Sequence, residues 1–229
     1  MLKYLYSALA LFICLSSVAQ DIKKDTVQTA FKKNYGLRVG TDLNRLARNV
    51  YDKDYSGFEI VADYRMSKNL YIAAEVGNEK KFLDEEQFQN TQNGYYVKAG
   101  IDYNVFDNWL DMDNMIYVGG RVAYSNFSNE LNSYPISNIN NPFFPPTQFS
   151  GDKTEDLSAV WLEFVAGFKV EVVNNLYLGV SARLSYLASN KEPENFENIW
   201  IPGYNKVNSG KFGVGFNYTI SYLIPFKKK

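Results

Sequence analysis

Histidine is absent from this chain of 229 residues, and cysteine occurs once, at Cys14. Imidazole is the most common general base and metal ligand in proteins, so the many hydrolytic and metal-dependent mechanisms that need it are excluded. Cys14 lies in a leader that we expect to be removed, which would leave the mature chain without a thiol. Disulfide bonds, thiol nucleophiles and cysteine or histidine zinc sites are then excluded as well.

The chain also lacks an excess of either charge and, beyond residue 20, a long apolar run. Its formal net charge is -1, whereas proteins that bind nucleic acids show a basic excess or a basic stripe, so we expect no nucleic-acid partner. After residue 20, no unbroken apolar stretch approaches the roughly 20 residues that a spanning helix needs. Any membrane insertion of the mature chain must therefore use strands.

The first residues have the pattern of a secretory signal peptide. Lys3 is followed by an apolar stretch over residues 5–15 and then by Ser17 and Ala19, the small pair that signal peptidase requires. The stretch is shorter than the roughly 20 residues of a membrane anchor. We therefore expect a signal peptide over residues 1–19, cleavage before Gln20, and export of the mature chain.

Alternation of apolar and polar residues dominates the rest of the chain, which is typical of strands with two unlike faces. It is clearest from Phe212 to Phe226, where every second residue is large and apolar and most of the residues between them are small or polar. The same pattern predicts eight strands, over residues 35–42, 58–66, 70–77, 95–105, 116–125, 160–171, 176–186 and 212–226.

The connections between these strands alternate in length. Residues 67–69, 106–114 and 173–175 form the shorter connections, and residues 44–54, 78–93, 128–156 and 189–209 form the longer ones. Short turns at one end and long loops at the other are typical of outer-membrane barrels. We therefore predict an all-β fold, an eight-stranded antiparallel up-and-down transmembrane β-barrel over residues 34–229. A flexible periplasmic segment over residues 20–33 would precede it.

The composition of the polar face predicts that this face points inward. An eight-stranded barrel is just wide enough to be filled by side chains, so charges of both signs can pair there while glycines make room. Facing lipid, six basic side chains at roughly 2 to 4 kcal/mol each would cost about 12 to 24 kcal/mol, more than the ~5 to 15 kcal/mol by which a domain is stable. The expected lumen ion-pair network consists of Arg38, Glu59, Asp63, Arg65, Glu75, Lys98, Asp102, Arg121, Glu163, Lys169 and Arg183.

Tyrosines on the apolar face fit the same orientation. They fall into two sets near the two ends of the strands, as expected for aromatic belts at the level of the lipid headgroups. The sets are Tyr64, Tyr103 and Tyr222 toward the short turns, and Tyr95, Tyr124 and Tyr186 toward the long loops. A soluble periplasmic barrel, with these aromatic residues in an apolar core, is the structural alternative.

Several of these stretches also resemble a family of small outer-membrane β-barrel proteins of unknown function. They are residues 35–40, 57–65, 68–81, 174–184, 191–206 and 211–226. The design is similar to that of the small eight-stranded barrels of the OmpA and OmpX type. The resemblance implies an architecture and a location in the outer membrane of a Gram-negative bacterium, but no assigned activity and no catalytic residue.

The leading functional hypothesis is a non-enzymatic barrel with a side-chain-filled lumen. It would serve envelope integrity or surface interaction through its long extracellular loops, with no cofactor and no metal. A narrow channel or small-solute pore is an alternative, because the inward face is charged. A carboxylate-dependent lipid-modifying enzyme is a further alternative, with Asp102, Glu163 and Glu171 as its inward candidates.

Two long loops are the expected places of contact with a partner, because function concentrates in loops. The aromatic residues of loop 128–156 are Phe143 and Phe144, and those of loop 189–209 include Phe196, Trp200 and Tyr204. They form a possible contact surface for a surface protein or a glycan, in addition to the lipid around the barrel. Alternatively, these side chains pack on one another and on the barrel rim and close its mouth. The sequence leaves the oligomeric state open.

Overall fold

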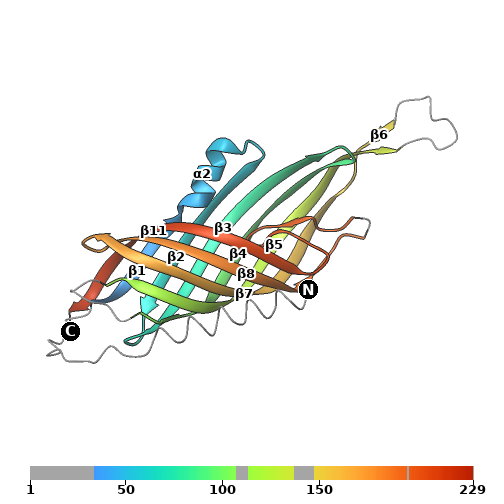
Figure 1. The fold of residues 1–229 in the computed structure, drawn as a ribbon. Coiled ribbons are helices and arrows are strands. Elements are labelled where there is room, and N and C mark those ends of the chain that lie inside the picture. Colours follow the sequence, from blue (N-terminus) through green and yellow to red (C-terminus); the bar gives the residue numbers. More distant parts are fainter. Residues whose placement is uncertain (1–33, 107–112, 137–146, 195, 229) are drawn as a thin grey trace, which may run out of the picture. The chain divides into compact units, whose positions relative to one another are not determined.

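The computed structural model describes residues 34–106, 113–136, 147–194 and 196–228. Eight long antiparallel strands form a ring in which each pairs with both neighbours and the last pairs with the first (Figure 1). They are β1 (Asn34–Asp42), β2 (Tyr55–Arg65), β3 (Leu70–Glu85), β4 (Phe88–Asn104), β5 (Met115–Ile136), β7 (Lys153–Val173), β8 (Leu176–Asn190) and β11 (Phe212–Lys228). The ring confirms the predicted eight-stranded up-and-down barrel.

Four short elements accompany the ring. Helix α2 (Leu43–Tyr51) follows β1, and β6 (Thr147–Phe149) pairs with the end of β5. Strands β9 (Trp200–Ile201) and β10 (Asn205–Lys206) form a separate hairpin. Among the described residues, no helix is long and apolar enough to cross a membrane. The predicted signal peptide (1–19) and the segment 20–33 lie outside the described residues.

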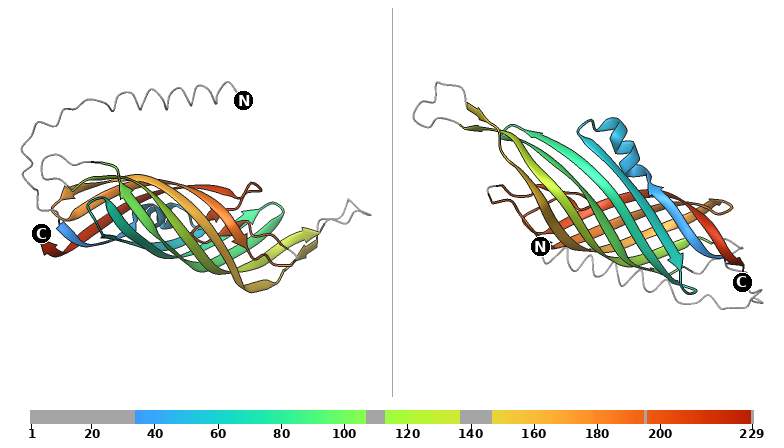
Figure 2. Two further views of the ribbon diagram at one scale, coloured as in Figure 1. Left: turned by 90° about the horizontal axis from the view of Figure 1, so that it is seen from below. Right: turned by 180° about the vertical axis from the view of Figure 1, so that it is seen from behind.

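The two ends of the barrel differ, and Figure 2 shows the strands running obliquely between them. We call the end with the connections β2–β3, β4–β5 and β7–β8 the turn end, and the other the loop end. The turn between β7 and β8 is a tight one, in which Asn175 adopts a positive φ of 65°. Asparagine tolerates this left-handed conformation better than most residues do.

The strands extend further at the loop end than predicted. Residues 78–93, expected as a loop, continue β3 and β4 to a turn at Glu86 and Gln87, and loop 128–156 contains the ends of β5 and β7 and all of β6. Apolar outward residues stop near residue 77, but the ladder continues with polar outward residues such as Asn78 and Lys80. Backbone hydrogen bonds hold the extension together without the apolar alternation.

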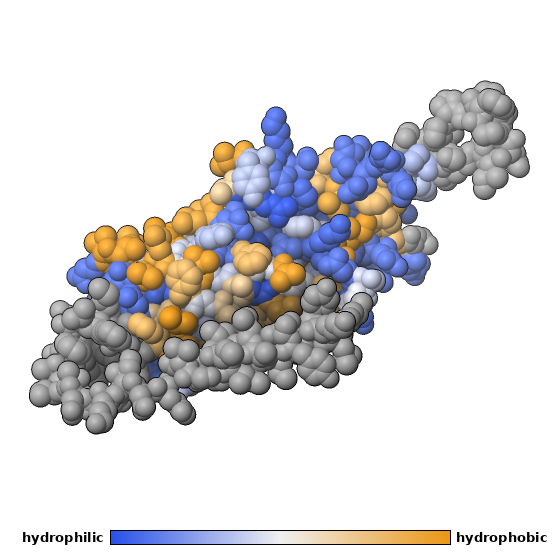
Figure 3. All heavy atoms as spheres, viewed as in Figure 1, coloured by the Kyte–Doolittle hydropathy of each residue, from blue (hydrophilic) through white to orange (hydrophobic). Residues whose placement is uncertain are grey.

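The large apolar side chains of the wall point outward. On β11, Phe212, Phe216 and Tyr222 are 55%, 60% and 51% exposed, and all six tyrosines of the two predicted belts are exposed as well. Figure 3 shows apolar residues gathered over the left part of the visible face and hydrophilic ones toward the ends of β3 and β4. A soluble barrel would carry its apolar side chains inside, so the described strands contradict that alternative.

The inside of the barrel is filled by aromatic and charged side chains. Tyr96 and Trp161 are completely buried there, together with Glu59 and Asp102. Glycine makes room for them: a Cβ added at Gly77 would lie 2.3 Å from the hydroxyl oxygen of Tyr96. The barrel core is therefore its lumen, filled by these side chains.

Candidate functional site

The eleven residues of the predicted lumen network all point into the barrel, where ten are buried and Lys169 is half-buried. They fall into three clusters ordered from the loop end to the turn end. Glu59 belongs to the upper cluster. The middle cluster contains Glu75, Lys98, Asp102, Arg121, Glu163 and Arg183. The lower cluster contains Arg38, Asp63, Arg65 and Lys169.

In the upper cluster, one guanidinium group serves three buried carboxylates. Arg45 descends from α2 between Asp42, Glu59 and Glu79, and its Nε lies 3.5 Å from Asp42 Oδ2 and 3.2 Å from Glu59 Oε2. Its Nη1 forms an ion pair with Glu79. The three carboxylates are at most 1% exposed, so the cluster holds an excess of buried negative charge.

Neutral donors stabilise this negative excess. Tyr55 Oη donates to Glu79 Oε1 at 2.6 Å, and Tyr96 Oη donates to Glu59 Oε2 at 2.6 Å. Asn217 Nδ2 donates to Asp42 Oδ2 at 2.7 Å, and the backbone N–H of Gly203 donates to Glu79 Oε2 at 2.7 Å. Hydrogen bonds to an ionised acceptor are stronger than those between neutral groups, so these donors replace much of the water that the carboxylates lose.

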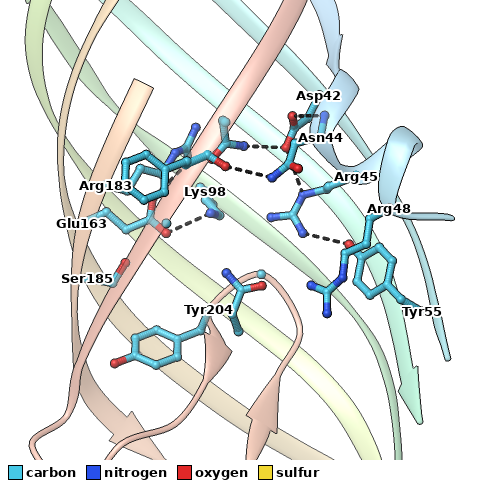
Figure 4. A pocket seen from close by; sticks show the side chains of 15 residues that line it. Asp42, Asn44, Arg45, Arg48, Tyr55, Lys98, Glu163, Arg183, Ser185 and Tyr204 are labelled. Carbon is cyan, nitrogen blue, oxygen red and sulfur yellow. Dashed lines mark hydrogen bonds and ion pairs between the residues drawn. The ribbon is translucent and has the colours of Figure 1, made fainter. Parts of the chain in front are cut away.

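The middle cluster is balanced, with three bases and three acids. Arg183 binds Glu75 through two hydrogen bonds of 2.6 and 3.0 Å, in the bidentate geometry that suits guanidinium and carboxylate groups. Lys98 donates to Glu163 at 2.8 Å, and Arg121 Nη2 donates to Asp102 at 2.9 Å. Figure 4 shows Lys98 and Glu163 facing each other across a dashed line, with Arg183, which also donates to Glu163, beside them.

In the lower cluster, two cations share one carboxylate. Arg38 Nε donates to Asp63 Oδ1 at 2.6 Å, and Lys169 Nζ donates to Asp63 Oδ2 at 2.5 Å. Aromatic faces stabilise the positive excess: the guanidinium carbon of Arg38 lies 4.9 Å from the ring centre of Tyr71, and Lys169 Nζ lies 5.2 Å from that of Tyr117.

Arg65 of the lower cluster and Glu171 hold the turn end together. Arg65 pairs with Asp113 at 3.2 Å and donates to the carbonyl oxygen of Lys68 in the β2–β3 turn at 2.7 Å. Glu171, a candidate in the enzyme alternative, accepts a hydrogen bond from the backbone N–H of Asn175 at 2.8 Å. Both side chains therefore fix a turn.

The spaces left among these side chains are small. One pocket of about 50 Å³ lies between α2, β11 and the β9–β10 hairpin, and Arg45, Lys98 and Glu163 line it (Figure 4). A second cavity, of about 30 Å³, lies between the middle and lower clusters beside Arg121 and Lys169. Drug-sized ligand sites measure roughly 300 to 1,000 Å³, so these spaces suit a few water molecules.

Within the described residues, no group of three or more acidic, cysteine or histidine side chains has the arrangement of a metal site. The clustered acids instead meet arginine, lysine, tyrosine and asparagine.

The β9–β10 hairpin closes the mouth of the barrel. Trp200, Ile201 and Tyr204 are 8%, 0% and 3% exposed, and the Tyr204 ring packs edge-on against Trp161 at 5.8 Å. Gly203 has a φ of 82°, and a Cβ there would lie 2.4 Å from the Tyr96 ring, so the hairpin fits only with glycine at its bend.

Trp200 and Tyr204 are therefore buried and do not offer an exposed contact surface; they pack at the barrel rim, as in the alternative in which these aromatic side chains close its mouth. Burying their rings against the lumen aromatics removes more apolar surface from water than an exposed loop would. Phe196 is half-buried and packs edge-on against Phe88 at 5.3 Å. Phe143 and Phe144 lie outside the described residues.

Helix α2 is fastened to β3 by charges at its C-terminal end. Asp52 accepts hydrogen bonds from Arg48 at 3.0 Å and from Lys81 at 3.1 Å. Burial alone would raise the pKa of Asp52, but these two cations outweigh it and hold the pKa below its usual value. The junction is thus strongest when Asp52 is ionised.

Sequence reasoning missed Arg45, Glu79 and Tyr55, which complete the upper cluster. Glu79 and Tyr55 continue the period-two series of inward positions on β3 and β2, so counting further along each strand would have found them. Arg45 lay in a segment expected to be a loop. The helical signal there is the apolar spacing of Leu43, Ala47 and Val50 after Asp42, whose side chain caps α2 by accepting a hydrogen bond from the Asn44 N–H at 2.9 Å.

Comparisons with known proteins give a family and distant structural likenesses. The family model of a domain of unknown function, DUF6048, matches residues 1–229. The structure is similar to that of Ail, the attachment invasion locus protein of Yersinia pestis, with 12% identity and a TM-score of 0.41 over 84% of this chain and 98% of that chain. It is also similar to Neisserial surface protein A (NspA), with 14% identity and a TM-score of 0.44 over 82% of this chain and 94% of that chain. A comparison with curated proteins gives no match.

Proposed function

We propose that this chain, which belongs to the DUF6048 family, is an exported outer-membrane barrel of a Gram-negative bacterium that catalyses no reaction. Its lumen is closed by its own side chains, and its task is structural or a surface interaction at the loop end. Outer-membrane lipid surrounds the wall.

The outward apolar wall is the observation that carries this proposal. On β4, exposed apolar side chains run from Tyr95 to Val105, and Phe58 on β2 and Phe164 on β7 continue the band around the ring. Ten residue steps of ~3.3 Å along a strand tilted by ~40° span a height of about 25 Å, which is the height of the apolar band of transmembrane barrels. Monomeric soluble proteins rarely expose such a continuous apolar surface.

The engaged carboxylates support a role without catalysis. Asp102 is held by Arg121, Glu163 by Lys98 and Arg183, and Glu171 by the β7–β8 turn. A catalytic carboxylate must be free to exchange a proton with a substrate. If the enzyme alternative were correct, replacing each of the three by its amide would abolish a lipid-modifying activity.

A surface role is supported by the length of the strands at the loop end. Hairpin β3–β4 and the arm formed by β5, β6 and β7 continue beyond the apolar band with outward side chains that are mostly polar. A surface protein or a glycan would bind there through loop 128–156 or through loop 189–209. In loop 189–209 only the exposed residues could take part, because Trp200 and Tyr204 are buried. Capturing partners from intact cells, with and without a shortened β5–β7 arm, would test this part.

Fractionation and gel mobility test location and export. We expect the protein in the outer-membrane fraction, a mobility shift on boiling, and a mature chain that begins at Gln20 by mass spectrometry. Recovery in the soluble periplasmic fraction, with no mobility shift, would overturn the proposal.

Epitope insertion tests the orientation of the two ends. A tag in the β3–β4 turn after Glu86 should bind antibody on intact cells, and the same tag in the β7–β8 turn after Asn174 should bind only after the outer membrane is permeabilised. The opposite pattern would place the loop end in the periplasm.

Planar bilayers separate a closed barrel from the pore alternative. The purified barrel should give no steady conductance, because three clusters of paired charges and the β9–β10 hairpin fill the lumen. A stable current that changes with Arg121→Gln or Glu163→Gln would instead establish the narrow channel.

A further inference from the structure

The barrel wall contains a gap that α2 fills. Strand β1 ends at Asp42, opposite Thr219 of β11, while Thr41 lies opposite Ile60 of β2. Both neighbours continue toward the loop end, β2 to Tyr55 and β11 to Phe212. Within the described residues, no strand lies between these two free edges. Figures 1 and 2 show α2 at this place, beside β1 and β2.

Polar side chains of α2 and its cap bind the backbone of both free edges. Asn49 Nδ2 donates to Gly57 O at 2.8 Å and Asn49 Oδ1 accepts from Gly57 N at 2.7 Å, so one side-chain amide replaces a peptide group of the missing strand. On the other side, Asn44 Nδ2 donates to Phe216 O at 3.1 Å, and Tyr218 N donates to Asp42 Oδ1 at 3.2 Å. Backbone groups exposed to hydrocarbon need such partners.

The polarity of α2 is the reverse of that of a helix on a soluble protein. Its polar side chains point at the barrel, with Arg45 buried in the upper cluster. Its outward stripe is Leu43, Ala47, Val50 and Tyr51, of which Val50 is 86% and Tyr51 70% exposed. At ~100° per residue, these four residues cover an arc of about 100°, the width of an apolar helix face.

The outward stripe is continuous with the apolar wall on both sides. Phe58 and Ile60 on β2 are 47% and 41% exposed, and Phe216 and Tyr218 on β11 are 60% and 50% exposed. The hydrogen bonds from α2 reach Gly57 and Phe216, which places the helix directly between these residues.

We propose that α2 is a lipid-facing part of the wall, whose outward stripe is buried among the acyl chains and headgroups of the surrounding leaflet. This inference rests on the proposed outer-membrane location. Lipid is the occupant because the stripe joins a surface that already faces lipid, and because its tyrosine stands at the end of the helix, where an apolar ring with a polar tip suits the membrane interface.

Quenching of a fluorophore at position 50 tests the proposal. In a Cys14→Ser background, Val50→Cys carries the label, and the protein is reconstituted in phospholipid vesicles. Phe216→Cys serves as the control in the wall and Glu86→Cys as the control in water. We expect a label at position 50 to resemble one at 216, quenched several-fold more by lipids with brominated acyl chains than by aqueous iodide. The label at 86 should show the reverse.

The three labels distinguish a failure of this inference about α2 from a failure of the proposed outer-membrane function. A label at 50 that resembles the one at 86, with 216 still in lipid, would overturn the inference and leave the proposed function standing. A label at 216 that reports water would overturn the proposed function. Protection of position 50 from both quenchers would mean that protein covers the stripe, which also overturns the inference. Val50→Trp with brominated lipids repeats the measurement without an attached label.

Discussion

Replacing Arg45 by methionine tests whether the upper cluster holds α2 in the wall. The change keeps an unbranched apolar stem and removes the positive charge from among Asp42, Glu59 and Glu79, which are 1%, 0% and 0% exposed. Removing one partner of a buried ion pair costs ~3 to 5 kcal/mol because the other charge is left uncompensated. This guanidinium serves three carboxylates. We therefore expect a loss of at least ~3 kcal/mol from the free energy of unfolding.

Urea unfolding in phospholipid vesicles, followed by tryptophan fluorescence and by gel mobility, measures this loss. At a slope of ~2 kcal/mol per molar urea, the midpoint should fall by about 1.5 M or more. The matched control is Arg48→Met, one turn further along α2. Arg48 is 25% exposed, with an ion pair to Asp52 at 3.0 Å and a ring contact with Tyr55 at 4.1 Å, so its loss should be about 1 to 2 kcal/mol at most.

A triple variant separates charge from packing. Arg45→Met combined with Glu59→Gln and Glu79→Gln leaves acceptors for Tyr96 and Tyr55 but removes two of the three charges, so more than half of the lost stability should return. Equal losses for Arg45→Met and Arg48→Met would refute the electrostatic reasoning. A triple variant no more stable than Arg45→Met would assign the loss to the packing of the arginine stem.

Three further predictions concern the hairpin, the aromatic lining and pH. Gly203→Ala should cost about 2 kcal/mol or more in urea titrations, because Gly203 has a φ of 82° and a Cβ there would lie 2.4 Å from a buried ring. The control Gly210→Ala, with nothing within 4 Å among the described residues, should cost ~0.5 kcal/mol or less. Similar costs for the two variants would contradict the tight packing of the β9–β10 hairpin in the barrel mouth. Tyr96→Phe removes a hydrogen-bond donor to the buried carboxylate of Glu59 and should cost ~1.5 to 3 kcal/mol. Tyr71→Phe keeps the ring face that lies against the Arg38 guanidinium and should cost below ~1 kcal/mol. The reverse order of the two costs would contradict the roles assigned to these tyrosines. Burial would raise the pKa of Asp52, but its cationic partners hold the pKa below the ordinary aspartate value of ~3.9. The ionised Asp52 therefore contributes its full stabilisation above pH ~3.9, and this stabilisation is lost as the pH falls through the lower pKa of the folded protein. A carboxyl-carbon NMR titration with a midpoint at or above ~3.9 would contradict this prediction.

The orientation of the barrel could be predicted from the sequence because a period of two assigns every residue of a strand to one of two faces. Phe216 and Asn217 illustrate this: the first is 60% exposed and the second 4%. The cost of placing arginine or lysine in lipid then decides which face is the lumen. Local composition and one energetic argument suffice for this level of structure.

The extent of the strands and the identity of ion-pair partners could not be predicted in this way. Beyond the apolar band, outward side chains such as Lys80 face water, so the alternation fades although the ladder continues. Partners depend on register around the closed ring: Lys169 and Asp63 are 106 residues apart, and Arg183 and Glu75 are 108 apart. Periodicity places all four inside and leaves the pairing undetermined.

The neutral lining of the lumen contacts charges of both signs, and this links the fold to the proposed function. Around the negative upper cluster, Tyr96 and Asn217 present hydrogen-bond donors; around the positive lower cluster, Tyr71 and Tyr117 present ring faces. Every charged residue of the predicted network thus already has a partner within the described interior. A ligand would have to break one of these contacts to bind there, at the cost of leaving a buried charge unpaired. In the proposed outer-membrane location, the mostly polar hairpins at the loop end face no such penalty, so the loop end is where we expect a partner to bind.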